Sequence, residues 1–225
     1  MDWTRAVDNY CERTDPGFWA EPLNAVSNAA FLIAALVCWR LYGRRRDPGL
    51  HLLIAVLAAI GVGSFLFHTV AQVWAGVADV LPILGFILIY VHLATVRFLG
   101  LPVWAGWLAV AGYLPASAAV SAAIGAVTGP LNGSTGYLPV LLLIAGYAAW
   151  LWRARPATAR RLAAGAGILA LSLTFRTLDA SVCPAWPPGT HFLWHLLNGA
   201  MLGWMIATIA RDADPPGLAR EVRAS

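Results

Sequence analysis

The sequence predicts an all-α integral membrane protein built as one bundle of seven transmembrane helices. Of its 225 residues 60% are hydrophobic and only 12% are charged, a balance that excludes an ordinary soluble globule. The apolar residues gather in seven runs of about spanning length. Short connections rich in Gly, Pro and Asn separate these runs, and nothing indicates a repeat or a second domain. We therefore expect a single membrane domain over residues 1–225, with an N-terminal lid (1–24) and a C-terminal tail (211–225).

The first run is expected to remain as a span, because the polar, acidic stretch Met1–Asp15 lacks the basic-then-apolar order of a signal peptide. Loops at 43–49 and 128–133 carry residues that end helices. In chain order the expected spans are Ala25–Tyr42, His51–His68, Val77–Phe98, Val103–Ile124, Thr135–Trp152, Arg161–Leu178 and His191–Ala210.

The basic residues, all of them arginine, predict the orientation of the bundle. They gather in the loops after the first, third and fifth spans and in the tail, whereas the loops on the opposite side hold none and the N-terminal segment holds only Arg5 and Arg13. By the positive-inside rule the N-terminus lies outside and the tail is cytoplasmic. The net charge of +4 thus indicates membrane orientation and does not point to a nucleic-acid partner.

Two acidic residues lie in or beside apolar sequence and need partners. Asp79 falls in the third span, and Asp179 follows the sixth. Asp179 is three residues after Arg176, so we expect the two to form a structural ion pair on one helical face.

Histidines mark one end of the last span. His191 and His195 are four residues apart, so their imidazoles share a helical face. A single histidine near the headgroups would be unremarkable, but ionisable pairs within spans are usually functional.

The topology brings further polar side chains to the same depth, namely Ser64 and His68 at the outer end of the second span and Asp79 at the start of the third. Three imidazoles with an open fourth position are typical of catalytic zinc, which lowers the pKa of a water ligand to ~7. Asp79 could carry the proton to a leaving amine, and Ser64 could orient that carboxylate or donate to an oxyanion. The other two histidines, His51 and His92, lie at inner helix ends and are expected to be structural.

The motifs Ser64-x-x-x-His68, Asp79-x-x-Pro82 and His191-x-x-x-His195 resemble the signature of the alkaline ceramidases. This family belongs to a heptahelical hydrolase superfamily that includes the adiponectin and progestin receptors. The segments 10–28 and 178–183 also resemble the ceramidase branch more than the receptor branch, and the similarity covers nearly the whole chain.

The resemblance implies zinc on His68, His191 and His195, with Asp79 and Ser64 as catalytic residues. It also implies a disulfide between Cys11 and Cys183, which both fall on the expected outer face, whereas Cys38 is expected to pack inside the first span. The family's calcium site corresponds to an acidic stretch whose alternative interpretation is a lid held by hydrogen bonds. Its residues here are Asp8, Asn9, Tyr10, Glu12, Thr14 and Glu21.

Three functions remain open at this point. The first is a zinc amidase that hydrolyses the N-acyl bond of ceramide-like membrane lipids to a fatty acid and a long-chain base. The second is a hydrolase of another acyl lipid, amide or ester. The third is a non-catalytic receptor or metal transporter, which the apolar inner halves of the helices and the ceramidase-like N-terminus disfavour. The resemblance suggests a bacterial-type inner-membrane protein with its metal site facing outward; the oligomeric state stays open.

Overall fold

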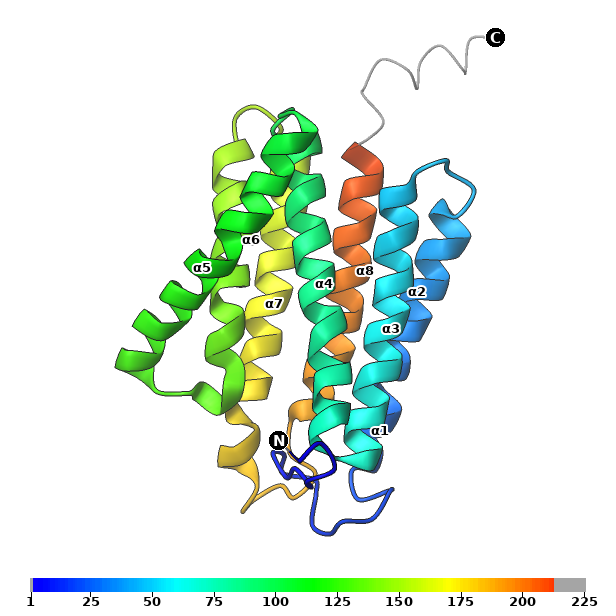
Figure 1. Ribbon diagram of the computed structural model, residues 1–225, viewed down its shortest axis with the longest axis vertical. Coiled ribbons are helices and arrows are strands. Elements are labelled where there is room, and N and C mark those ends of the chain that lie inside the picture. Colours follow the sequence, from blue (N-terminus) through cyan, green and yellow to red (C-terminus); the bar gives the residue numbers. More distant parts are fainter. Residues whose placement is uncertain (1, 213–225) are drawn as a thin grey trace.

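The computed structural model describes residues 2–212, and these form the expected bundle of seven spans (Figure 1). Within these residues there is no strand, only an isolated bridge between Ala6 and Gln72. The last part of the expected tail, residues 213–225, lies outside the described residues. The first span consists of α1 (Pro22–Ser27) and α2 (Ala29–Tyr42), and the fifth of the 3-10 helix η1 (Leu131–Tyr137) and α6 (Leu138–Leu151). The other spans are α3 (Pro48–Val70), α4 (Val73–Phe98), α5 (Val103–Thr128), α7 (Pro156–Val182) and α8 (His191–Asp212).

Several helices begin earlier than expected because proline starts them. The second and sixth spans were expected from His51 and Arg161, but the helices begin at Pro48 and Pro156. A proline in the first turn loses no hydrogen bond and already has a helical φ. Asp47 caps α3 by accepting a hydrogen bond from the Leu50 backbone N–H at 3.2 Å.

The helices differ greatly in how many of their own residues are buried in the bundle. The first span and α3, α4, α7 and α8 supply most of the buried apolar side chains, and α8 runs through the middle of the group (Figure 1). In α5, by contrast, Gly106 alone is buried. The end of α5 that leads into η1 leans away from α4 in Figure 1. At the same end of α4, the side chains of Val77, Val80 and Leu81 are exposed.

A glycine lets α3 and α4 approach closely where polar side chains gather. A Cβ at Gly63 would collide with the backbone carbonyl of Ala78. Because Ser64 follows Gly63 and Asp79 follows Ala78, this backbone contact places the two polar residues beside each other.

The two ends of the bundle carry different polar groups. The end opposite the N-terminus holds the ion pairs Asp47–Arg97 and Arg155–Asp212, with shortest N–O distances of 2.7 Å and 2.8 Å. Hydrogen bonds from Arg97 and from backbone amides of α3 outweigh the effect of burial and lower the pKa of Asp47. The expected inward orientation of this end stays a prediction.

Candidate metal centre

The three predicted histidines meet in the interior. His68 from α3 and His191 and His195 from α8 are each 1% exposed, and their ligand nitrogens lie within 4.8 Å of one another. Three of their ring nitrogens, His68 Nε2, His191 Nδ1 and His195 Nε2, are buried without a hydrogen-bond partner. Buried polar atoms are rarely left unpaired, so the arrangement fits a metal ion held by three imidazoles. It is the one such group of three or more His, Cys, Asp or Glu side chains found within residues 2–212.

Glu21 fixes the ring of His68. Its Oε2 accepts a hydrogen bond from His68 Nδ1 at 2.6 Å, and a carboxylate can only accept, so Nδ1 carries the proton and Nε2 is free for a metal. Arg13 Nε and Asn24 Nδ2 donate to the same carboxylate. Burial raises the pKa of Glu21, but these three donors outweigh it and leave the pKa below its ordinary value.

Ser27 fixes His195 in a similar way. The Ser27 hydroxyl donates its single proton to the Asn24 carbonyl at 2.9 Å and lies 2.8 Å from His195 Nδ1. It must therefore accept from Nδ1–H, which leaves His195 Nε2 free for a metal. The third ring, His191, stacks on Tyr10 with a centroid separation of 3.7 Å. Each histidine of this candidate metal site is thus contacted by a residue between Tyr10 and Ser27.

The N-terminal lid is anchored on the loop before α8. Cys11 and Cys183 form the expected disulfide, and Cys38 is free and buried. The buried carboxylate of Asp179 accepts hydrogen bonds from three backbone N–H groups, those of Cys11 at 3.1 Å, Thr190 at 2.7 Å and His191 at 2.9 Å. The expected ion pair with Arg176 was wrong, because Asp179 instead satisfies N–H groups at the start of α8 that have no partner within the helix.

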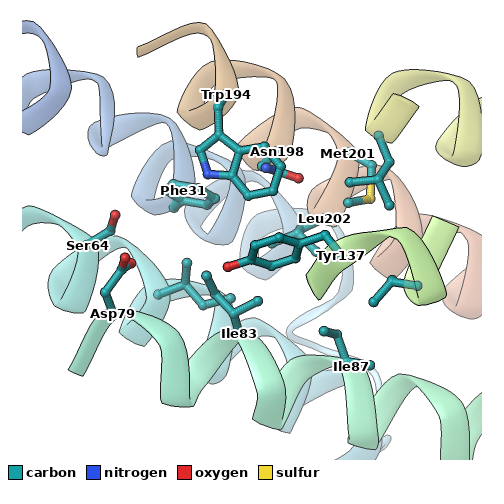
Figure 2. A pocket seen from close by; sticks show the side chains of 13 residues that line it. Phe31, Ser64, Asp79, Ile83, Ile87, Tyr137, Trp194, Asn198, Met201 and Leu202 are labelled. Atoms are coloured by element: carbon teal, nitrogen blue, oxygen red, sulfur yellow. The ribbon is translucent and has the colours of Figure 1, made fainter. Parts of the chain in front are cut away.

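The side chains of Asp79 and Ser64 lie with their oxygens close together at one side of the pocket (Figure 2), and Asp79 is within electrostatic reach of His68. Asp79 does not cap α4, whose N-cap is Gln72, and it does not hold the Nδ1 of His68, which bonds to Glu21. Its side chain lines the cavity described next.

An apolar pocket continues from Asp79 into the bundle. Two polar groups that the sequence did not single out line it: Tyr137, whose hydroxyl points into the space in Figure 2, and Asn198, whose buried Nδ2 has no hydrogen-bond partner. Ser64 and Asp79 are the other two polar residues of the lining. The rest of the lining is apolar and consists of Phe31, Ile60, Ile83, Ile87, Val140, Leu169, Trp194, Met201 and Leu202. The pocket is small, about 50 Å³, and its lining is apolar with a few polar groups, as is typical of lipid-binding sites.

Among the described residues, the expected calcium carboxylates Asp8, Glu12 and Glu21 do not form a group of three ligands. Asp8, Asn9 and Thr14 are exposed, and Glu12 accepts the backbone N–H groups of Leu23 and Asn24 at the start of α1. Glu21 has both oxygens in use, as described above. Its cationic partner is Arg13, whose guanidinium also donates to the carbonyls of Asp15, Gly17 and His68. This donor set does not fit calcium, because the chain's own cation already neutralises Glu21; the calcium assignment stays a prediction.

The other two histidines are remote from this centre. His51 Nε2 lies 3.2 Å from the Gly43 carbonyl, and the His92 ring is tilted against Trp107 with a centroid separation of 4.5 Å. That both histidines are structural stays a prediction.

The protein is therefore a heptahelical membrane protein. Its buried three-histidine site, with a carboxylate nearby, is a candidate catalytic metal centre. The family model for ceramidases matches residues 5–212, and the chain belongs to this family. The comparison with curated proteins found no match. Family membership implies a hydrolase of amide bonds with a lipid substrate.

Proposed function

We propose that this protein is a zinc-dependent amidase that hydrolyses the N-acyl bond of ceramide-like lipids to a fatty acid and a long-chain base. The observation that carries the proposal is the Asp79 carboxylate, which lines the apolar pocket and lies within electrostatic reach of His68 in the three-histidine group. When bound by His68, His191 and His195, zinc supplies a Lewis acid for the amide carbonyl and a water of lowered pKa.

The residues of the chain supply binding and proton transfer. The apolar pocket, which has to widen from its volume of about 50 Å³, takes the acyl chain and so brings the amide to Asp79 and Ser64. Asp79 accepts the proton of the attacking water and delivers it to the amide nitrogen as the C–N bond breaks. Ser64 orients this carboxylate, and Tyr137 and Asn198 are placed to hydrogen-bond the polar part of the substrate. We further propose that the metal end faces the outside of a bacterial inner membrane, with the arginine-rich end in the cytoplasm.

The test combines metal analysis with hydrolysis of a panel of N-acyl lipids by the purified protein. Wild type should contain about one zinc per chain. Asp79→Asn should retain the zinc and the melting temperature and lose about 10²–10⁴-fold in turnover. Ser64→Ala should lose less. An Asp79→Asn protein that is folded, zinc-loaded and fully active would remove Asp79 from the mechanism, and a wild type without a transition metal would exclude a zinc enzyme.

A further inference from the structure

The Arg13 side chain is a buried cation inside the N-terminal lid. Arg13 is 8% exposed, and its guanidinium makes four hydrogen bonds, all of them to oxygen atoms. Nε donates to a carboxylate oxygen of Glu21, and Nη2 donates to the backbone carbonyl of His68 at 3.2 Å. Nη1 donates to the carbonyls of Asp15 and Gly17 at 3.2 Å and 3.3 Å. Carboxylate and carbonyl oxygens are also the atoms that bind calcium in proteins. The lid therefore contains an oxygen-lined cation site, and Arg13 occupies it.

The surroundings of this lid cation site favour a positive charge. The side chains of Arg13 and Glu21 are 4% and 3% exposed, so water screens their attraction little. His68 lies in the last turn of α3, where backbone carbonyls lack partners within the helix and the negative end of the helix dipole attracts cations. Asp15 Oδ1 accepts the Gly17 N–H at 2.6 Å and so holds the turn whose two carbonyls face the guanidinium. Three separate parts of the chain thus direct oxygen atoms at one cation.

A calcium ion could enter this site only by displacing Arg13. Both oxygens of Glu21 already accept hydrogen bonds, and a calcium ion beside the guanidinium would be repelled by it. Glu12 offers no free carboxylate either, because its two oxygens accept the backbone N–H groups of Leu23 and Asn24. The chain therefore meets with its own side chain the need for positive charge that a metal ion would otherwise meet.

We propose that Arg13 is the permanent cation of the lid and takes the place of calcium, so that the lid and the histidine site do not respond to calcium. Arg13 bonds at once to Glu21, which orients the His68 ring, and to the backbone of His68 itself. Because this cation is covalently attached to the chain, it cannot dissociate when calcium is scarce. The proposal concerns the lid and does not depend on which bond the protein hydrolyses.

The first test uses wild-type protein that has been freed of metal and reloaded with zinc alone. Calcium binding is measured by equilibrium dialysis, and the melting temperature and zinc affinity are measured with and without millimolar calcium, the range in which the weakest calcium sites of proteins bind. We expect no calcium in the lid and no change in either quantity. One bound calcium per chain that raises the melting temperature or the zinc affinity would overturn the proposal, and this result does not depend on any variant folding.

The second test removes the cation and supplies it again from solution. Arg13→Ala should lower the melting temperature by about 6 °C or more, because it leaves the buried Glu21 carboxylate without its counter-charge. Ethylguanidinium, which reproduces the part of the side chain that was removed, should recover part of this loss. Ethylammonium, which has the charge without the planar set of donors, should recover less. Arg5→Ala is the matched control, because it removes an exposed arginine from the same lid, and it should behave like wild type with both additives.

Two results of the second test would overturn the proposal. One is an Arg13→Ala protein that melts like wild type, which would show that the lid does not require a cation. The other is a destabilised Arg13→Ala protein that responds to ethylguanidinium no more than wild type does, which would assign Arg13 to packing alone. A calcium response that appears in Arg13→Ala and is absent from wild type would support the proposal, because calcium would then enter the site only after the guanidinium has left it.

Discussion

Replacing Glu21 with glutamine should weaken the binding of zinc by the three histidines, although Glu21 is not expected to contact the zinc itself. Its carboxylate accepts hydrogen bonds from His68, Arg13 and Asn24 and is 3% exposed. Glutamine has nearly the same shape, but it has no charge and only one accepting oxygen. It cannot serve His68 and Arg13 as the carboxylate does, so the His68 ring loses the partner that fixes its tautomer and orientation.

The size of the effect follows from these contacts. Loss of the hydrogen-bond partner of a metal histidine typically lowers metal affinity about 10–100-fold, which is about 1.4–2.7 kcal/mol. The fold should also be destabilised, because the buried Arg13 guanidinium loses its counter-charge. Breaking such a pair from one side costs up to about 3–5 kcal/mol, and the amide oxygen should offset part of this.

The assay is zinc competition with a chelator of known affinity, with the melting temperatures of the metal-free and metal-loaded proteins measured on the same preparations. Glu12→Gln is the matched control. Glu12 lies in the same lid and accepts the backbone N–H groups of Leu23 and Asn24, but it bonds to no histidine. It should lower the melting temperature and leave zinc affinity unchanged. The positioning role of Glu21 is refuted if folded Glu21→Gln protein binds zinc as tightly as wild type.

The remaining predictions concern the metal, the lid, the pocket and the opposite end of the bundle. His68→Ala should lose the bound metal, measured by elemental analysis; full occupancy would contradict the site. Cys11→Ser opens a bridge between residues 172 apart and should cost about 4–5 kcal/mol in the entropic model, seen as a lower melting temperature and faster proteolysis of the lid. Met201→Trp should narrow the inner pocket and shift hydrolysis toward short acyl chains, whereas an unchanged chain-length profile would place the acyl chain elsewhere. Arg97 lowers the pKa of Asp47 in the folded protein. The pair therefore contributes its whole stabilisation at pH values above the pKa of an aspartate in the unfolded chain, about 3.9. This stabilisation is lost as the pH falls through the lower pKa that Asp47 has in the folded protein. Asp47→Asn should therefore lower the free energy of unfolding by about 1–3 kcal/mol at pH 7. The melting temperature of the variant should also depend less on pH in the acid range than that of wild type.

The sequence predicted the features that helix geometry alone determines. A spacing of four residues puts His191 and His195 on one face of α8, as it does for Ser64 and His68 on α3. Counting spans then places His68, His191 and His195 at one depth, because consecutive helices cross the membrane in opposite directions. These arguments need no knowledge of side-chain packing, and the structure confirms the spans and brings the three histidines together.

The contacts that orient the histidines could not be predicted in this way. Tyr10 and Glu21 lie in a lid without helical or strand periodicity, so no pattern relates them to α3 or α8. Ser27, which contacts His195, is the last residue of α1, and no sequence pattern predicts the break before α2 begins at Ala29. Sequence spacing also paired Arg176 with Asp179, but it could not show that three backbone N–H groups compete for that carboxylate.

Arg13 shows how one side chain can change what a family resemblance implies. The resemblance places Glu21 at a calcium site, and a calcium ion there would need oxygen atoms that are free to coordinate it. In this structure one oxygen of Glu21 accepts from Arg13 and the other from His68 and Asn24. The same guanidinium donates to the carbonyl of His68, so it ties the lid to α3 at the histidine itself. The negative charge of Glu21 is thus balanced by a cation that the chain carries, and the lid positions His68 through the Arg13–Glu21 pair.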